Sequence, residues 1–345
     1  MMRRTPSDDA ARWARATLGD EDGPLPVTYS ILSADGLLER IADAYAIGAP
    51  VSCHLVRPGS NDTYFVTTEE DDFVARVYGA HWRSLPEISY EIELLRHLAE
   101  RGVSVSLPIA GRDGVVARSL PAPEGTRYLV MFTRAPGSPL SWDDEEHCRL
   151  AGMSAAALHA AADDFRSPHQ RFRLDLEYLV EAPLAALRPF LLHRPDDLRH
   201  VEGLAGRLRA RAADAIGSGL DWGVCHGDLG NRNIHVAADG TLTMIDFDLA
   251  GPGWRAYDFV AAQWLASYEG RAPIWDAFVR GYRERRPLAA ADLAAVPVFH
   301  GMSRLWTVGL DARNAARWGT LPMSDYYLDT YMTSLREWED EYGRA

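Results

Sequence analysis

A short polar segment between two apolar runs constrains this chain more than any other feature of its sequence. Residues 224–236 read VCHGDLGNRNIHV, and the polar part contains His226, Asp228 and Asn233. A surface hairpin would explain the segment, because Gly-Asp and Gly-Asn pairs are typical of turns. Taken alone, the segment therefore leaves two interpretations open, an ordinary turn and a loop that carries chemistry.

A second segment, farther along the chain, favours the loop that carries chemistry. Residues 242–251 read LTMIDFDLAG, an apolar strand-like run that ends with Asp246 and Asp248. If the strands around the two segments lie side by side, Asp228, Asn233 and Asp246 meet in one cleft. Oxygen donors of this kind suit Mg²⁺, which keeps waters and substrate phosphates in its other positions. We therefore expect a magnesium site in this cleft.

The bulk composition sets the size of the protein and excludes some partners. A chain of 345 residues exceeds the usual size of one hydrophobic core, so two domains or two lobes are expected. With 47% hydrophobic and 25% charged residues, the chain should fold as an ordinary soluble globule. Its formal net charge of −13 argues against nucleic acid as a partner, because phosphate backbones are bound through basic surfaces.

The sequence also predicts a cytoplasmic location and no membrane partner. Its first residues lack the apolar core of a signal peptide, and no uninterrupted apolar stretch is long enough to cross a bilayer. The three cysteines, Cys53, Cys148 and Cys225, lie far apart and form no CxxC pair. This usage indicates a reducing compartment, without a disulfide framework or a zinc site.

The order of the predicted elements indicates a sheet followed by a helical region. Residues 33–45 begin with a Ser cap and have apolar residues at helical spacing. A helix is expected over 89–102, and from residue 144 onward the pattern is mainly helical. Short runs rich in strand-forming residues predict an antiparallel meander over 51–58, 62–68 and 72–78, with a last strand in 128–140 that runs into a Pro/Gly-rich connector.

The combination H-x-D-x-x-x-x-N followed by I-D-F-D resembles the catalytic and metal-binding segments of the aminoglycoside phosphotransferase and choline kinase family, relatives of the protein kinases. The resemblance extends from about residue 33 to 335, and these two motifs are its specific part. It implies an α+β, bilobal, protein-kinase-like fold with a small antiparallel-sheet N-lobe and a larger, mainly helical C-lobe. The expected divisions are a leader (1–32), the N-lobe (33–131) and a C-lobe (132–345) with the catalytic loops and acceptor site.

The resemblance also implies roles for the motif residues. Asp228 would be the catalytic aspartate that orients and deprotonates the acceptor hydroxyl. Asn233 and Asp246 would hold the Mg²⁺ ions that bridge the nucleotide phosphates. His226 would support the catalytic loop, and Asp258, in the sequence YDFV, would brace it.

For the nucleotide, the resemblance implies ATP or GTP held between the lobes. The hairpin expected to cover the phosphates contributes Ser60 and Asn61 as candidate phosphate donors, although an ordinary turn explains them equally well. The connector 131–137 would be the hinge, with backbone groups of Met131 and Thr133 pairing with the purine edge. Backbone contacts have no sequence signature, so ATP and GTP are not distinguished.

Arg76 is the departure from the family pattern. It stands where the family has a phosphate-pairing lysine, and the sequence contains no lysine at all. Arginine keeps the charge and can bind phosphate bidentately, and Glu91 in the following helix is its expected partner. Arg76 is a functional substitute, the mark of a binding-only pseudokinase, or an ordinary strand-end arginine. We favour the substitute, because Asp228, Asn233 and Asp246 are all present.

The predicted activity is Mg²⁺-dependent transfer of the γ-phosphoryl group of ATP or GTP to a hydroxyl of a small molecule, such as an aminoglycoside-like antibiotic, an amino alcohol or another metabolite. A protein serine or threonine is the alternative acceptor, because residues 300–327, together with residues 91–109 near the front of the chain, show a looser similarity to the bacterial stress-response kinases. A nucleotide-binding pseudokinase is the non-enzyme alternative. A metallophosphoesterase is disfavoured, since Arg232 stands where those enzymes have a histidine after Gly-Asn. The role of Asp248 stays open.

Overall fold

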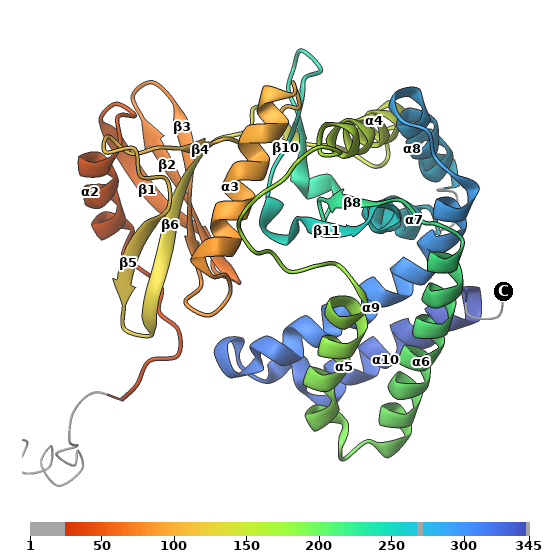
Figure 1. Cartoon of the computed structure of the whole chain (residues 1–345). Helices are drawn as coiled ribbons and strands as arrows, with labels where there is room; N and C mark the ends of the chain where they lie inside the picture. Colours follow the sequence, from red (N-terminus) through yellow and green to blue (C-terminus); the bar gives the residue numbers. More distant parts are fainter. Residues whose placement is uncertain (1–24, 268–271, 343–345) are drawn as a thin grey trace, which may run out of the picture.

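An antiparallel sheet and a mainly helical region divide the molecule (Figure 1). The computed structural model describes residues 25–267 and 272–342, so most of the expected leader, 1–32, lies outside the described residues. The sheet has six strands in the order β1-β2-β3-β6-β4, with β5 also paired to β6. This arrangement confirms the predicted sheet-containing front and helical remainder.

The predicted meander agrees with the observed strands to within one residue at each end. β2 alternates between buried and half-buried side chains, as expected for a strand with one face on a core. The last predicted strand begins earlier than expected, because β5 and β6 form a hairpin. The strands are β1 (Pro50–Arg57), β2 (Asn61–Thr68), β3 (Asp72–Tyr78), β4 (Pro108–Ile109), β5 (Arg118–Ala122) and β6 (Gly125–Thr133).

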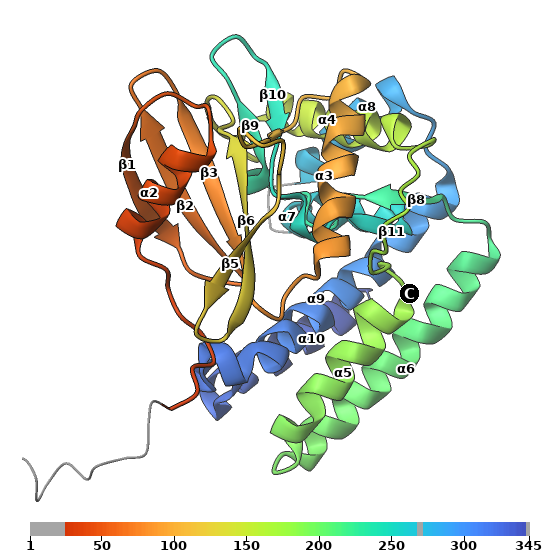
Figure 2. The same ribbon diagram turned by 60° about the vertical axis from the view of Figure 1, so that its left-hand side comes forward.

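Two helices cover opposite faces of the sheet (Figure 2). Helix α2 (Ala34–Ala44) is capped by the Ser33 side chain and packs on the outer face. Helix α3 (Leu85–Glu100) lies on the inner face, toward the helical region. It begins before the predicted residue 89, because Ser84 and Glu87 form a capping box ahead of the apolar face.

The helical region contains two further small sheets that carry the motif loops. In one sheet β9 pairs with both β10 and β7, and in the other β8 pairs with β11. The strands are β7 (Ser138–Pro139), β8 (Trp222–Cys225), β9 (Ile234–Val236), β10 (Leu242–Met244) and β11 (Gly251–Trp254). The polar segment therefore connects β8 to β9, and the second motif follows β10, so paired strands bring the two motifs together.

Helices surround these small sheets and confirm the predicted helical remainder. They are α4 (Glu145–Ala161), α5 (Ala182–Leu187), α6 (Pro195–Gly217), α7 (Val260–Ala266), α8 (Ala272–Arg285), α9 (Ala290–Trp318) and α10 (Asp325–Tyr342). Short 3₁₀ or π segments are η1 (Glu177–Glu181), η2 (Arg188–Leu191), η3 (Asn231–Asn233), η4 (Phe247–Leu249), η5 (Arg255–Phe259) and η6 (Leu321–Met323). Helices α9 and α10 run beneath the motif loops toward the sheet (Figures 1 and 2).

One hydrophobic core joins α3 to the helical region. Ile88 and Leu94 of α3 belong to the same buried cluster as Phe132 of the sheet and Phe259 and Met302 of the helical region. A second, smaller cluster lies between α2 and the outer face of the sheet. The shared core fixes the position of α3 relative to the motif loops, and therefore the position of any side chain that α3 directs toward them.

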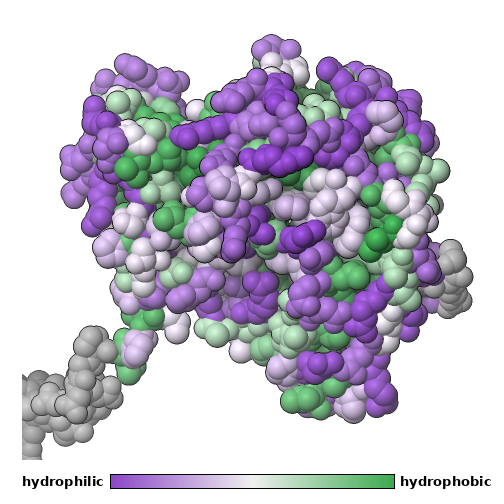
Figure 3. Space-filling model, viewed as in Figure 1, coloured by the Kyte–Doolittle hydropathy of each residue, from purple (hydrophilic) through white to green (hydrophobic). Residues whose placement is uncertain are grey.

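The surface of the molecule is mostly polar on the side seen in Figure 3, with apolar residues in small groups. Among the described residues, no helix combines the length and the apolar character needed to cross a membrane.

Candidate active site

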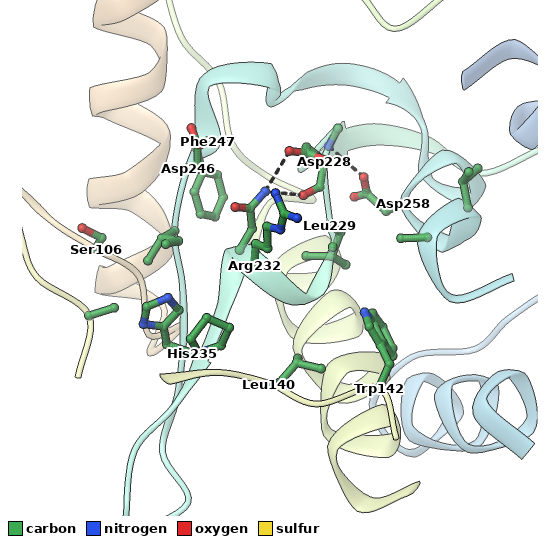
Figure 4. Close-up of a pocket in the computed structure, with 18 of the residues that line it drawn as sticks. Ser106, Leu140, Trp142, Asp228, Leu229, Arg232, His235, Asp246, Phe247 and Asp258 are labelled. Carbon is green, nitrogen blue, oxygen red and sulfur yellow. Dashed lines mark hydrogen bonds between the residues drawn. The ribbon is translucent and has the colours of Figure 1, made fainter. Parts of the chain in front are cut away.

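A cavity of about 1220 Å³ lies where the inner face of the sheet meets the two motif loops. Its lining includes Arg76 from β3, Glu91 from α3, and Asp228 and Asp246 from the motif loops. In Figure 4, Asp228 lies between Asp246 and Asp258, with Leu140 and Trp142 on the opposite wall. Typical ligand pockets measure roughly 300–1,000 Å³, so this cavity has room for a nucleotide together with a second molecule.

Buried hydrogen bonds hold the loop that carries Asp228. The backbone N–H groups of His226 and Gly227 donate to the two carboxylate oxygens of Asp258, at 2.7 and 2.8 Å. The His226 ring donates through Nε2 to the carbonyl of Ile245, at 3.0 Å, and accepts at Nδ1 from the amide of Asp228. Burial lowers the pKa of His226, so the ring is neutral at pH 7. These contacts give His226 and Asp258 the supporting positions that the sequence analysis expected.

The turn at Gly227 is needed to bring this loop close to the second motif. Gly227 has φ +82°, and a Cβ atom there would lie 2.2 Å from the carbonyl oxygen of Leu249. A side chain at this position would therefore push the two motif loops apart.

Asp228 is positioned by Asn233 from the end of the same segment. The Asn233 side chain donates through Nδ2 to the Asp228 backbone carbonyl at 2.7 Å and to its carboxylate Oδ2 at 2.9 Å. Burial, and then the charge of Asp246, raise the pKa of Asp228 to about 7. A carboxylate with such a pKa suits proton transfer near neutral pH.

Asp246 follows β10 in a left-handed backbone conformation, with φ 62° and ψ 61°. It is the one residue other than glycine with positive φ among the described residues. Such a conformation is costly for a residue with a Cβ, and it is characteristic of functional sites. The side chain is 39% exposed, toward the cavity, and its Oδ1 accepts from Nη2 of Arg76 at 3.0 Å.

Arg76 bridges the two lobes inside the cavity. Its Nη1 donates to Oε1 of Glu91 at 2.7 Å, so the predicted Arg76–Glu91 pair is present. The second carboxylate oxygen of Glu91 accepts from the Tyr78 hydroxyl at 2.9 Å. Burial opposes the charge on Arg76, but the carboxylates of Asp246 and Glu91 outweigh it and raise the pKa of Arg76. The guanidinium is therefore charged and directed at the second motif.

Asp248, whose role the sequence left open, faces away from the cavity. Its carboxylate accepts from Nε1 of Trp82 at 2.6 Å and from Nε of Arg83 at 3.1 Å, both in the connection between β3 and α3. Its backbone carbonyl accepts from Arg83 and from Arg171. Asp248 thus fixes the start of α3, and with it the helix that carries Glu91, to the second motif.

The expected phosphate donors Ser60 and Asn61 are not among the residues that line the cavity. The Ser60 carbonyl accepts from the Gly79 amide at 3.2 Å and from the Arg317 side chain at 3.3 Å. The hairpin between β1 and β2 reaches the cavity through other residues, including Arg57.

Of the two expected hinge residues, Met131 lies in the core and Thr133 lies in the cavity wall. Met131 is fully buried within the sheet and does not line the cavity. Thr133 does line it, but its amide donates to the carbonyl of Leu107 at 2.9 Å, and its carbonyl accepts from the Ser106 hydroxyl at 2.5 Å. The cavity wall continues from Thr133 into residues 134 and 135.

Sequence reasoning missed Arg57. This exposed side chain lines the cavity, and its charge lowers the pKa of Asp228 against the larger effect of burial. The signal that could have indicated it is an arginine directly before Pro58-Gly59, at the tip of the hairpin, in a chain without lysine.

The donor set fits a magnesium ion that also binds phosphates. Among residues 25–267 and 272–342, no group of three or more His, Cys, Asp and Glu side chains is arranged to hold a metal ion. The motif loops instead offer the Asp246 carboxylate and the Asn233 amide oxygen, near Asp228. Mg²⁺ in nucleotide sites is typically held by one or two carboxylates, with phosphates and waters completing its shell.

Comparison with known proteins identifies the family. A family model described as "Phosphotransferase enzyme family" matches residues 56–293, more than half of the chain. The chain belongs to this phosphotransferase family. The match confirms the family that the two motifs indicated, and covers β2 to β6 of the sheet and both motif loops of this phosphotransferase.

Individual relatives cover most of the phosphotransferase chain. A protein of Deinococcus radiodurans is 40% identical over 323 residues, which are 92% of this chain and 93% of that protein. A homoserine kinase of Phenylobacterium zucineum is 32% identical over 282 residues, 79% of this chain and 83% of its own. The structure of a microcompartment-associated aminopropanol kinase is similar with a TM-score of 0.71 and 25% identity, over 88% of this chain and 95% of its own.

These similarities confirm the predicted enzyme class and fold. The phosphotransferase has the protein-kinase-like fold of its structural neighbours, with the sheet and helical parts described above. It is a kinase whose acceptor group is an alcohol.

Proposed function

We propose that this kinase transfers the γ-phosphoryl group of ATP or GTP to a hydroxyl of a small metabolite, with Mg²⁺ as cofactor. The observation that carries the proposal is the Arg76 guanidinium, held between Glu91 at 2.7 Å and Asp246 at 3.0 Å in the cavity that also contains Asp228. In this arrangement a permanent cation stands beside a carboxylate suited to Mg²⁺ and a carboxylate suited to accept a proton. Those three functions are the ones that phosphoryl transfer requires of the protein.

The chain's own residues would divide the work as follows. Arg76 and Arg57 would offset the negative charge of the nucleotide phosphates from two sides of the cavity. Asp228 would orient the acceptor hydroxyl and accept its proton. Asn233 and Asp246 would hold Mg²⁺, which, when bound, bridges the phosphates and neutralises their charge.

For the purine, we propose the connector segment 133–135 as the site of backbone contacts, because it forms the cavity wall next to the sheet. Ser60, Asn61 and Met131 stay predictions as nucleotide-binding residues, although they lie outside the cavity lining. A flexible hairpin that closes over a nucleotide would be needed to bring Ser60 and Asn61 to the phosphates.

A small molecule is the acceptor that this architecture favours. The C-lobe side of the cavity is bounded by α7, α9 and α10, so an acceptor there is surrounded by side chains on several sides. The aminopropanol kinase and the homoserine kinase to which the chain is similar are named for small alcohols that carry an amine.

Calorimetry of nucleotide binding, followed by an activity assay, tests this proposal. The purified protein is titrated with ATP and with GTP, each with and without Mg²⁺, and then assayed for phosphorylation of a panel of small alcohols. We expect Mg²⁺-dependent binding of at least one nucleotide, and Asp228→Asn should retain this binding but lose turnover. Absence of binding for both nucleotides, or unchanged turnover in Asp228→Asn, would overturn the proposal.

A further inference from the structure

The last turn of helix α9 contacts the hairpin between β1 and β2, in the other lobe. Arg317 donates through Nη2 to the backbone carbonyls of Gly59 and Ser60, at 3.0 and 3.3 Å. An earlier part of the same helix lines the cavity, and Arg317 lies about two and a half turns beyond Val308, the last of its lining residues. Figure 2 shows α9 running to the lower end of the sheet. Arg317 therefore links the hairpin to the helix that bounds the C-lobe side of the cavity.

Gly79, directly after β3, makes room for this contact. Its amide donates to the Ser60 carbonyl at 3.2 Å. A Cβ atom on Gly79 would lie 2.4 Å from Nη1 of Arg317 and 2.6 Å from the Ser60 carbonyl oxygen. A side chain at this position would therefore separate the guanidinium from the hairpin.

A second set of contacts holds the turn of the hairpin from within its own lobe. Asp62 is fully buried, and its carboxylate accepts from the Gly59 amide at 3.3 Å and from Nη2 of Arg127 at 2.7 Å. The Tyr29 hydroxyl donates to the same carboxylate, and the Tyr29 ring packs against Arg317, with 4.8 Å between the guanidinium carbon and the ring centroid. Because these contacts fix the conformation of the turn, the contact with Arg317 sets its position relative to the C-lobe.

The hairpin directs Arg57 into the cavity. In a regular strand successive side chains point to opposite faces, yet Val56 and Arg57 both line the cavity. The pairing of β1 with β2 shifts in register between Leu55 and Arg57, and an irregularity of this kind re-aims a side chain. Because Gly59 lies only two residues after Arg57, the position of the turn determines where the Arg57 guanidinium enters the cavity.

We propose that Arg317 is a positioning residue, which holds the hairpin so that Arg57 faces the nucleotide phosphates. Arg317 does not itself line the cavity, so it acts through Arg57, and this role rests on the proposed function. The Arg57 side chain is long and exposed, so on an unattached hairpin it would spread over many positions. On a hairpin held at its turn, Arg57 loses less conformational freedom when it pairs with a phosphate.

Calorimetric titration with Mg²⁺-nucleotide tests this role. Arg317→Gln should raise the Kd about tenfold, because the shorter amide does not reach the two carbonyls and a charge-assisted contact to phosphate is weakened. Arg317→Lys should recover part of the affinity, since an ammonium can donate to one of these carbonyls. Arg313→Gln is the matched control, because Arg313 lies one turn earlier on α9 and packs over Trp82 instead of the hairpin. Unchanged affinity in the folded Arg317→Gln protein overturns the proposal.

A double-mutant cycle shows whether Arg317 acts through Arg57. Arg57→Ala alone should also raise the Kd about tenfold, because it removes the cation that the hairpin places in the cavity. With both substitutions the Kd should remain about tenfold above that of the unaltered protein, since the second change removes nothing further. Independent effects, which multiply to about a hundredfold, would contradict the positioning role.

Hydrogen exchange tests the contact in the nucleotide-free protein. In Arg317→Gln the amides of residues 55–63 should exchange faster than in the unaltered protein, because the hairpin has lost its attachment to α9. Arg313→Gln should exchange there as the unaltered protein does. Mass spectrometry of the peptide that contains these residues gives the result. Equal exchange in Arg317→Gln and the unaltered protein would show that Arg317 does not hold the hairpin.

The two proposals fail in different ways. An unaltered protein that binds Mg²⁺-nucleotide, together with an Arg317→Gln protein that binds it equally well, keeps the proposed function and loses this role for Arg317. A protein that binds neither ATP nor GTP loses the proposed function itself, whatever the exchange of the hairpin amides.

Discussion

Asp246 and Asp248 stand two positions apart at the end of the same strand, and each pairs with an arginine from the sheet-containing lobe. The Asp246 side chain is 39% exposed and pairs with Arg76 at 3.0 Å, inside the cavity. The Asp248 side chain is 8% exposed and pairs with Arg83 at 3.1 Å, away from it. Identical chemistry therefore serves two purposes, because burial decides whether an ion pair is open to a ligand or belongs to the interior.

The surroundings of the two ion pairs explain the difference. Burial disfavours a charge on Asp248, but the guanidinium groups of Arg83, Arg76 and Arg171 outweigh this effect and lower its pKa. Removing one partner of such a buried pair leaves a charge without compensation. Asp246 can exchange its contact with Arg76 for a cation or for water, so its loss should affect function far more than folding.

The largest expected effect is on catalytic activity, and it distinguishes Asp246 from Asp248. Asp246→Asn should reduce kcat about a thousandfold while the melting temperature changes by no more than about 2 °C, because asparagine tolerates the left-handed backbone. The measurements are steady-state kinetics and thermal unfolding. Activity within tenfold of the unaltered enzyme would show that Asp246 does not hold the metal that phosphoryl transfer uses.

For the stability of the protein we expect the opposite result, because substitution of Asp248 should have a large effect and substitution of Asp246 a small one. Asp248→Ala should lower the free energy of unfolding by about 3–5 kcal/mol, because it leaves Arg83 buried and unpaired. The double variant Asp248→Leu with Arg83→Met should recover much of this loss, since apolar groups of similar size can replace a buried pair. Urea denaturation of both proteins measures the difference. Equal stability of Asp248→Ala and the unaltered protein would remove the distinction between the two aspartates.

Substitution of Arg76, the partner of Asp246, tests whether this ion pair contributes to nucleotide binding while the Arg83–Asp248 pair contributes to structure. Arg76→Lys should retain nucleotide binding to within about tenfold, because a point charge can pair phosphate where the guanidinium stood. Arg76→Met should weaken it about a hundredfold, since the cation is lost from the cavity. Calorimetric titration with Mg²⁺-nucleotide measures both variants. If Arg76→Met binds as tightly as Arg76→Lys, Arg76 belongs with Arg83 as a structural residue.

The smallest expected effect is on the pH dependence of stability, which depends on the pKa of Asp228. Its pKa of about 7 lies above the ordinary aspartate value of 3.8, so the folded, metal-free protein takes up a proton that the unfolded chain does not. This contribution to stability is present at low pH and is lost as the pH rises through about 7. Asp228→Asn should therefore raise the melting temperature by a few degrees at pH 8 and leave it unchanged near pH 4.

The same titration distinguishes the two aspartates of the second motif. Asp246 is one of the charges that raise the pKa of Asp228, so Asp246→Asn should move the loss of stability to lower pH. Asp248 is not among the main causes of that shift, and Asp248→Asn should leave the pH midpoint in place. Melting curves between pH 4 and 8 without metal give the result. Equal pH midpoints for the loss of stability in the unaltered protein, Asp246→Asn and Asp248→Asn would contradict this prediction.

Local patterns made much of the fold and part of the site predictable. The strands of the meander, the cap at Ser33 and the pair of Arg76 with Glu91 all depend on residue spacing or on the order of neighbouring elements. The meeting of the two motifs was predictable for the same reason, because the short strands beside Asp228 and Asp246 follow one another in the chain.

Other features depend on contacts between distant segments, and no local pattern reveals them. The Ser60 carbonyl is bound by Arg317 from the far end of α9, so the hairpin could not be placed from its own sequence. Asp248 is held by Trp82 and Arg83 from another lobe, which left its role open. The burial of Met131 likewise follows from the strands on both sides of β6.

The guanidinium of Arg76 also changes how this enzyme can be detected. Reagents that acylate a lysine beside the nucleotide phosphates need an uncharged amine, whereas a guanidinium stays protonated at any physiological pH. Because the sequence contains no lysine, such a reagent finds no side-chain amine anywhere in this protein. Surveys that capture kinases through an acylated active-site lysine would therefore overlook it, and lysine acetylation offers the cell no means of controlling its nucleotide site.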